Sequence, residues 1–287
     1  MHRGGLLRGT ASALAQLTSS PMGLLGFVLT LLVVFTGIFA DWLAPHDAFA
    51  LSVRNRFAAP SWDHVLGTDH LGRDILSRVI MGSRIALIVA FCTIALAMFG
   101  GLALGLLAGY GPRWLDHCLV LVFDAVYSFP YIMLALAVIT LFGSSLLVVI
   151  LVIGVTTLSA DARLVRTLTQ SIKNSEFVLA EHSLGAGSAR ILFRHIMPNI
   201  IGPLLIVVSM DIPVVITVEA GLSFLGLGVP PPAPSWGRIL NEGYSFIRQT
   251  PWIVIGGGLP LILATLGFTF LGEALRDIFD PKLRKRV

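Results

Sequence analysis

The residues best suited to chemistry gather in one polar stretch that separates two long apolar tracts. This stretch, residues 176–199, reads EFVLAEHSLGAGSARILFRHIMPN and mixes carboxylates, imidazoles and guanidiniums with large apolar side chains. Phe177, Ala180 and Leu184 are spaced to share one face of a helix. Glu176 opens that helix, where a negative side chain suits the positive end of the helix dipole. The stretch therefore begins with a predicted short amphipathic helix.

Gly185 predicts where this helix ends, because glycine readily takes the left-handed conformation that closes a helix. A second short helix is predicted from residue 187 onward, with Ile196 among its apolar side chains. Pro198 is expected to interrupt its hydrogen bonding. The first helix is only roughly 14 Å long, and a helix of that length is marginal alone in water. We therefore expect it to dock on a partner, either the rest of this chain or another protein.

The rest of the chain has the composition of a membrane protein. Of its 287 residues, 55% are hydrophobic and 13% are charged, whereas soluble domains carry about 25% charged residues. A helix needs about 20 apolar residues to cross the hydrocarbon layer. A turn at the sequence FGSS is expected to divide one overlong apolar tract. The sequence predicts an all-α polytopic membrane protein with six transmembrane helices at roughly 22–40, 85–109, 117–141, 145–162, 200–221 and 252–272.

Lys and Arg are divided unevenly between the connecting segments. Thirteen of the 20 fall in residues 1–21, 110–116, 163–199 and 273–287, and seven fall in residues 41–84 and 222–251. The positive-inside rule then places both termini in the cytoplasm. The predicted organisation is a cytoplasmic segment 1–21, a first transmembrane helix 22–40, an external loop 41–84 with an amphipathic helix, a core domain 85–272 with a cytoplasmic loop 163–199 and an external loop 222–251, and a cytoplasmic tail 273–287.

Several polar residues fall inside the predicted membrane helices, where charges are costly and usually face a cavity or a partner helix. Asp124, Ser128 and Pro130 lie along the third helix, and the proline predicts a kink that opens it. Asp211 and Glu219 lie in the fifth helix. These residues are candidates for the lining or gate of a translocation pathway. The alternative is that each is satisfied by a structural pair with a neighbouring helix.

Two further features of the predicted helices concern packing. A ladder of small residues in the second helix comprises Gly101, Gly105 and Gly109. Such ladders let helix backbones approach closely in lipid, so this one predicts a tight helix contact. Asp161, with Arg163 and Arg166, is expected to anchor the cytoplasmic end of the fourth helix.

The predicted external loop contains the sequence LGTDHLGRDILSR. Leu71, Ile75 and Val79 recur on one helix face, which predicts an interfacial helix leading into the second span. Asp74 and Arg78 are spaced for an exposed ion pair on that helix. A direct role of this helix in gating or in docking a receptor is the alternative.

The histidines and acids of the same loop do not have the spacing of a metal site. His64, His70, Asp63 and Asp69 match no established ligand pattern, so no metal is expected. The chain has no H-E-x-x-H motif, and Ser223 lacks the surroundings of a nucleophile. A membrane-embedded enzyme is therefore disfavoured, and no catalytic residue is predicted.

The polar stretch resembles a known motif. Its LAEHSLGAG and HIMPN sequences are similar to the EAA loop of ABC importer permeases, which reads E-A-A-x-x-x-G with I-x-L-P farther on. The positions that match this pattern are Ala180, Gly185, Ile196 and Pro198. The positions that depart from it are Leu179, Glu181 and Met197.

The resemblance covers nearly the whole chain. The segments similar to the peptide/nickel subfamily are LGTDHLGRDILSRVIMGSR, AGYG, EFVLA, GLSFLGLG, PSWGRIL and GEALRDIFDPKLR. Among the members of this subfamily, the chain resembles the C-type permease subunit of dipeptide and oligopeptide importers.

This resemblance implies a type I ABC importer permease fold with a cytoplasmic coupling helix that contacts an ATPase. The residues assigned to that contact are Glu176, Phe177, Ala180, Glu181, Leu184, Gly185, Ile196 and Pro198. The implied partners are a second homologous permease in a heterodimer, two cytoplasmic ATPase subunits or domains, an extracytoplasmic substrate-binding protein and membrane lipid, with no nucleic acid. The implied location is the bacterial cytoplasmic (inner) membrane.

ATP chemistry is expected on another chain, because no G-x-x-x-x-G-K-[ST] phosphate loop is present. No cofactor is expected in this chain, and ATP and Mg are expected on the partner ATPase. Peptides are the expected substrate, with nickel complexes, glutathione-like peptides and opine-like conjugates as alternatives. An autonomous secondary carrier or channel is the rival class, but the internal repeats typical of carriers are not detectable.

Overall fold

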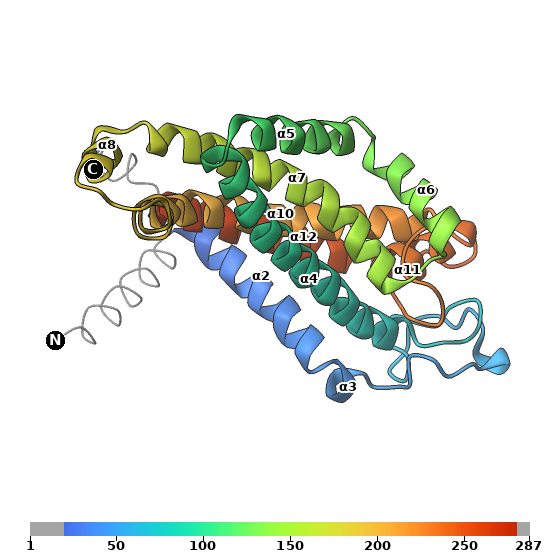
Figure 1. The fold of residues 1–287 in the computed structure, drawn as a ribbon. Coiled ribbons are helices and arrows are strands. Elements are labelled where there is room, and N and C mark those ends of the chain that lie inside the picture. The colour runs from blue at the N-terminus through green and yellow to red at the C-terminus, as the bar shows by residue number, and fades with distance from the viewer. Residues whose placement is uncertain (1–19, 280–287) are drawn as a thin grey trace.

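The computed structural model describes residues 20–279, and its regular structure in this range is helical (Figure 1). The expectations for residues 1–19 and 280–287 lie outside the described residues. The elements in chain order are α2 (Pro21–Ile38), α3 (Ala40–Leu43), η1 (Val53–Asn55), α4 (Ile75–Tyr110), α5 (Arg113–Tyr127), α6 (Tyr131–Phe142), α7 (Leu146–Lys173), α8 (Glu176–Ser183), α9 (Ser188–Arg190), η2 (Ile191–Ile196), α10 (Met197–Phe224), α11 (Trp236–Ser245) and α12 (Trp252–Phe279).

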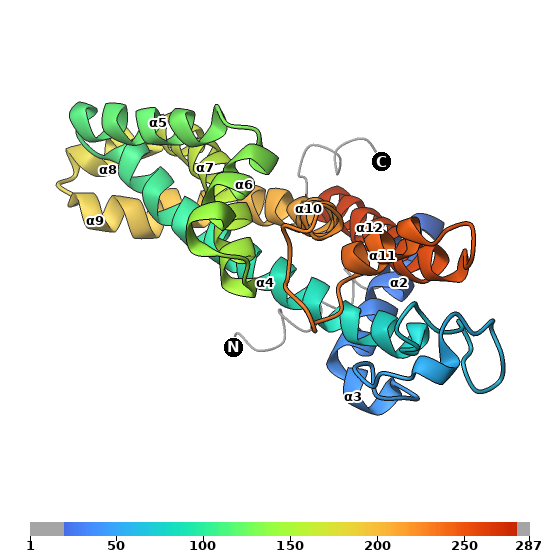
Figure 2. The same ribbon diagram turned by 90° about the vertical axis from the view of Figure 1, so that its right-hand side faces the viewer.

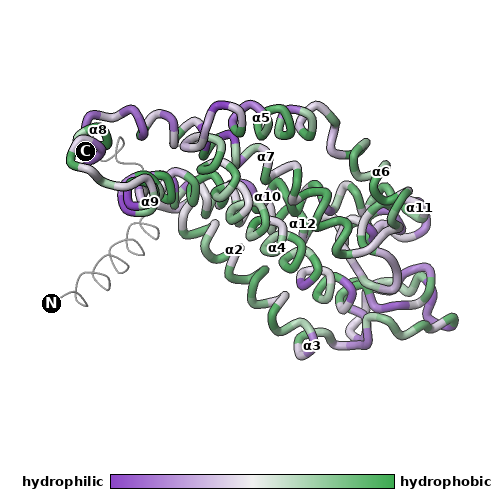
Figure 3. Tube along the Cα trace, in the orientation of Figure 1, coloured by the Kyte–Doolittle hydropathy of each residue, from purple (hydrophilic) through white to green (hydrophobic). Residues whose placement is uncertain are grey.

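The long helices run between two ends of an elongated bundle. Short helix α8 lies at one end, whereas α3, the loop that follows it and α11 lie at the other (Figure 1). Helix α5 covers the side of α7 that faces away from α2 and α12, as a second view also shows (Figure 2). The long helices are mostly hydrophobic, and hydrophilic residues concentrate toward both ends (Figure 3). This distribution is the one expected of a bundle that crosses a membrane.

The number of membrane-spanning helices agrees with the prediction of six when a bent pair is counted as one span. Within residues 20–279, five helices are long and apolar enough to cross a membrane, or up to six if a bent pair counts as one span. The predicted span 117–141 is a bent pair rather than one straight helix, because α5 and α6 meet at 90°. Pro130 stands at the start of α6, and the Ser128 hydroxyl donates to the Asp124 carbonyl oxygen at 2.7 Å. Proline has no N–H for a continuing helix, so the break falls there.

The predicted turn between the third and fourth spans is confirmed. Gly143 takes a φ of +80°, a left-handed conformation that glycine adopts at little cost. The Ser145 hydroxyl then accepts a hydrogen bond from the Val148 N–H at 3.2 Å and caps α7. Helix α7 continues beyond the expected residue 162, as far as Lys173. It therefore carries the bundle directly to the start of the polar stretch.

The glycine ladder lies in the most extensive helix contact of the bundle, between α4 and α7. A Cβ atom added at Gly105 would lie 2.6 Å from both the Ala162 carbonyl oxygen and the Val165 Cβ. A Cβ at Gly109 would lie 2.6 Å from the Thr169 Cβ. These distances are shorter than van der Waals contact, so only glycine fits. The packing role predicted for the ladder is confirmed.

One apolar core runs through the long helices. Its members come from α2, α4, α7, α10 and α12, which shows that these elements share a single interior. Representative fully buried or nearly buried members are Val33, Val89, Val149, Leu204 and Phe268.

The predicted interfacial helix at the other end of the bundle is wrong in two respects. Helix α4 begins only at Ile75, so Leu71 lies in the preceding loop. Asp74 does not pair with Arg78, because its carboxylate caps α4 by accepting the Ser77 N–H at 2.7 Å. A carboxylate at this position satisfies an N–H that the first helical turn leaves without a partner.

Arg78 instead belongs to a buried ion-pair network that joins the loop before α4 to α11. Its guanidinium reaches Asp69 at 2.5 Å and Glu242 at 2.6 Å. Arg73 contacts the same two carboxylates, at 2.7 and 3.0 Å. Burial alone raises the pKa of the Glu242 carboxyl, but the hydrogen bond and charge of Arg78, with the charges of Arg73 and His70, outweigh burial and lower it. Glu242 is therefore ionised at neutral pH.

Substituting Gly105 by Ala should destabilise the α4–α7 contact. The added methyl group meets the Ala162 backbone, which cannot rotate away, so we expect a loss of about 1–3 kcal/mol of folding free energy. Gly202→Ala is the matched control, since a Cβ there meets nothing within 4 Å. The free energy of unfolding of the two variants is measured on protein purified in detergent. Equal stability of the two variants would contradict the packing role.

Candidate functional site

Helix α8 follows α7 after a two-residue connection and ends in a defined capping motif. The Gly185 N–H donates to the His182 carbonyl at 3.0 Å, and the Ala186 N–H donates to the Glu181 carbonyl at 3.0 Å. Gly185 has a φ of +85°. This pair of bonds around a left-handed glycine is a Schellman motif. The sequence prediction of a short helix ended by Gly185 is confirmed.

Helix α8 attaches to its own chain through one side and leaves the predicted apolar face uncovered. Val178 is buried in the main core, together with Ile191 and Ile196 of the following segment. By contrast, 49% of Phe177 and 84% of Leu184 are exposed. The chain's own bundle therefore does not cover the face on which these two side chains were predicted.

The segment after the turn differs from the prediction. A separate second helix interrupted by Pro198 was expected, but α9, the π-helical η2 and α10 follow one another without a break. Proline lacks the N–H of a continuing α-helix, and the wider i→i+5 pairing just before it accommodates this defect. Ile196 is fully buried and Pro198 is exposed. Ile196 thus supports α8 from inside rather than offering a contact surface.

Other contacts hold this end of the chain together. His195 lies 3.8 Å from the Glu181 carboxylate, which links η2 to α8. At the base of α8, the Lys173 ammonium donates to the Tyr110 carbonyl oxygen at 3.0 Å and lies 4.9 Å from the Tyr110 ring centroid. Sequence reasoning missed Val178 and His195. Val178 lies before the turn at Gly185, whereas Ile191 and Ile196 lie after it. No single helical period in the sequence therefore reveals that the three side chains share one core.

Four of the five candidate pathway residues line two cavities that include residues of the α5–α6 break. The first, of about 490 Å³, is lined by Asp124 and Ser128 together with Asp116, His117, Val120, Leu121, Ala125 and Arg166. Asp124 forms an ion pair with Arg163 at 2.9 Å, and 55% of its side chain is exposed. Asp124 thus combines a structural pair with access to a cavity.

The second cavity, of about 360 Å³, contains Pro130 and Asp211. Aromatic side chains from the break, among them Tyr127 and Tyr131, line it opposite the hydroxyls of α7. Pro130 and Asp211 thus share one cavity, and the pathway role of each stays a prediction. The structure does not bring Asp124 into this second cavity.

Glu219 and Asp161 are the two remaining acidic residues, and both side chains are buried. Glu219 is 1% exposed, and its carboxylate accepts the Ser223 hydroxyl at 2.6 Å from the next turn of α10 itself, rather than from the neighbouring helix of the pairing alternative. The predicted grouping of Asp161 with the two arginines is wrong. Arg163 pairs with Asp124 and Arg166 pairs with Asp116, whereas Asp161 is buried and packs against the α4 glycines.

Comparison with known proteins decides the family. The family described as binding-protein-dependent transport system inner membrane component matches residues 101–285. The chain belongs to this family. The match covers α5 to α12 and only the C-terminal end of α4, from residue 101, and it confirms the resemblance to ABC importer permeases. The chain is thus a multi-pass membrane permease subunit.

Individual relatives of the binding-protein-dependent transport family align over most of the chain. The dipeptide transport system permease protein DppC of Alkalihalophilus pseudofirmus is 35% identical over 95% of this chain and 90% of its own length. The glutathione transport system permease protein GsiD of Pectobacterium atrosepticum is 40% identical over 88% and 85%. The oligopeptide transport system permease protein OppC of Bacillus subtilis is 32% identical over 95% and 90%.

Substituting Gly185 by Val should loosen α8 without disturbing the bundle. A β-branched residue at this φ costs about 1–3 kcal/mol, which raises the open population of the segment about 5- to 150-fold. Gly187→Val is the matched control, because both glycines face open space but Gly187 has a φ of −69°. Cleavage by trypsin at the exposed Arg190 should accelerate in Gly185→Val alone. Equal cleavage rates in the two variants would refute the strain argument.

Proposed function

We propose that this chain is one of two permease subunits of an ATP-driven importer that moves peptides into the cytoplasm, and that α8 is its coupling helix. The observation that carries the proposal is the geometry of α8. It is a short helix at one end of the bundle, anchored by Val178, closed by a Schellman turn and uncovered at Phe177 and Leu184. A transport subunit without a phosphate loop needs such a contact to receive work from a separate motor.

The proposed assembly follows from this arrangement. Two ATPase subunits or domains bind ATP and Mg and each receives one coupling helix, and this chain supplies none of the nucleotide site. A second, homologous permease completes the pathway beside the cavities at the α5–α6 break, and an extracytoplasmic binding protein delivers the substrate. Large apolar side chains such as Leu121 and Phe142 are 70% and 75% exposed on α5 and α6. They offer a surface for the second permease or for lipid.

A second substrate class has its own support. Relatives named for dipeptide and oligopeptide transport favour peptides, whereas the relative named for glutathione transport is 40% identical. Glutathione is itself a small peptide, so one pathway serves both chemistries. The binding protein makes the choice. Its affinity for a dipeptide compared with glutathione therefore distinguishes the two candidates, and nickel complexes and opine-like conjugates are tested in the same assay.

The proposed orientation puts both termini and α8 in the cytoplasm of a bacterial cell, with the loop 41–74 and α11 outside. The Lys and Arg distribution supports it. Single cysteines at Ser188 and Ser61, placed in a background lacking Cys92 and Cys118, should react with a membrane-impermeant reagent from opposite sides. Labelling of Ser188 from outside intact cells would reverse the proposed orientation.

Truncating Phe177 on the uncovered face of α8 should weaken binding of the ATPase. If Phe177 fills a groove on the ATPase, Phe177→Ala removes a buried aromatic side chain, at a cost of about 3–5 kcal/mol for full burial. Occupancy by the ATPase should then fall about 100-fold or more. The measurement is the amount of ATPase that co-elutes with the purified pair of permeases.

Phe49→Ala is the matched control for this experiment. Phe49 is exposed to a similar extent, 42% against 49%, but lies in the loop at the opposite end of the bundle. Its truncation should leave ATPase binding unchanged. Full ATPase retention by a folded Phe177→Ala permease would disprove the docking role of this face.

A further inference from the structure

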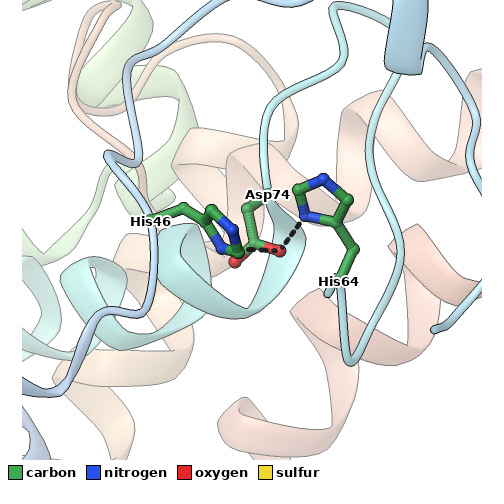
Figure 4. Close-up of side chains that lie close together, drawn as sticks. All are labelled: His46, His64 and Asp74. Atoms are coloured by element: carbon green, nitrogen blue, oxygen red, sulfur yellow. Dashed lines mark hydrogen bonds and ion pairs between the residues drawn. The ribbon is translucent and has the colours of Figure 1, made fainter. Parts of the chain in front are cut away.

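Two histidines meet one buried carboxylate at the start of α4, at the opposite end of the bundle from α8. Figure 4 shows the imidazole rings of His46 and His64 on either side of the Asp74 carboxylate. The Asp74 Oδ1 atom lies 2.9 Å from His64 Nδ1 and 3.9 Å from His46 Nδ1. The three residues come from separate parts of the loop before α4 and from the helix cap. We call them, with the adjacent Asp63, the imidazole cluster.

The charge of Asp74 has no permanent counterion. Only 1% of its side chain is exposed. Its Oδ2 atom accepts the N–H and the hydroxyl of Ser77, both at 2.7 Å, and its Oδ1 atom faces the two rings. Within residues 20–279, no Arg or Lys nitrogen lies within 4.0 Å of this carboxylate. Hydrogen bonds from Ser77 and the His64 ring compensate its burial, but no cationic side chain balances its charge, so the carboxylate is suited to a cation that binds beside it.

The opposite nitrogens of both rings face a second carboxylate. Asp63 lies 3.5 Å from His46 Nε2 and 3.7 Å from His64 Nε2. On the other side, His64 Nδ1 lies within hydrogen-bond distance of Asp74 Oδ1, at 2.9 Å, so this nitrogen donates to the ionised carboxylate, and a cation bound here takes the place of that proton. His46 Nδ1 is in fact buried without any hydrogen-bond partner. The two Nδ1 atoms and one carboxylate oxygen therefore converge, and after release of the His64 proton they are a set of ligands for a cation.

The backbone holds the two histidines in place. The His46 N–H donates to the Ser77 hydroxyl at 3.0 Å, and the same hydroxyl donates to Asp74. The His64 N–H donates to the Ser61 hydroxyl at 3.0 Å. Ser77 thus connects His46 and Asp74 directly. The cluster is preorganised, which lowers the cost of binding.

We propose that His46 Nδ1, His64 Nδ1 and Asp74 Oδ1 bind one zinc ion, with Asp63 orienting both rings from outside. Nitrogen and carboxylate ligands of this kind suit zinc. Tetrahedral zinc keeps neighbouring ligand atoms about 3.3 Å apart, and the two distances to Asp74 bracket this value. The ligand atoms all lie within 4.8 Å of one another. His46 is 36% exposed, so ions and solvent reach the site.

A second group of potential ligands in the same loop does not meet these conditions. Asp69, His70 and Glu242 also lie within 4.8 Å of one another. However, the carboxylates of Asp69 and Glu242 are already bound by Arg73 and Arg78, as described above. Two guanidiniums balance their charge and repel a cation. The imidazole cluster differs from this second group because no arginine binds its buried carboxylate.

Zinc binding should be measured on the full chain, purified with its partner permease through a tag that contains no histidine. The protein is treated with a chelator, dialysed against micromolar zinc and analysed for bound metal. We expect one zinc per chain. His46→Ala should weaken binding about 100-fold or more, since even loss of an outer partner costs about 10- to 100-fold. Asp63→Asn should weaken zinc binding about 10- to 100-fold, as loss of an outer partner does.

His70→Ala is the matched control, because it removes a histidine of the same loop and should keep the zinc. Asp74→Asn retains the oxygen that caps α4, so it tests the ligand without removing the cap. Thermal unfolding without zinc reports whether each variant is folded. The proposal is overturned if the unchanged protein binds no zinc, if folded His46→Ala and Asp74→Asn both retain it, or if His70→Ala loses it.

Discussion

The close approach of α4 and α7 is the constraint on which the other contacts depend. In lipid, helices gain little from the hydrophobic effect and associate through van der Waals packing, so small residues at the interface matter most. Gly101, Gly105 and Gly109 supply them, against Asp161, Ala162, Val165 and Thr169. The ladder fixes the register of the two helices along most of their contact. Whatever is attached to the end of α7 is therefore placed rigidly relative to α4.

The two ends of the bundle use this rigidity differently. At one end, α7 leads into α8, and Lys173 fastens the junction to Tyr110. There the chain buries Val178 and exposes Phe177, so α8 is held firmly but presents an apolar surface. At the other end, buried ion pairs join the loop before α4 to α11, and Arg78 contacts Asp69 and Glu242. The first end leaves apolar side chains uncovered, whereas the second holds its own elements together through buried ion pairs.

Local sequence signals predicted much of this fold. The FGSS turn, the short helix 176–183 and its glycine end follow from capping chemistry, which involves only neighbouring residues. The sequence could not reveal that Arg78 pairs with Glu242, which is 164 residues away, nor that His46 reaches Asp74. The third span is bent into α5 and α6, and apolar composition does not distinguish such a pair from one straight helix. Pro130 indicated a kink, but the 90° angle depends on packing against α7.

The central claim is that α8 is a docking element rather than part of the bundle. Amide hydrogen exchange of the permease pair, with and without its ATPase, tests it most directly. Residues 176–186 should exchange more slowly when the ATPase is bound, because the partner then covers Phe177 and Leu184. Residues 236–245 of α11, at the opposite end, should not change. Unchanged exchange at 176–186 while the ATPase is bound elsewhere on the chain would contradict the account.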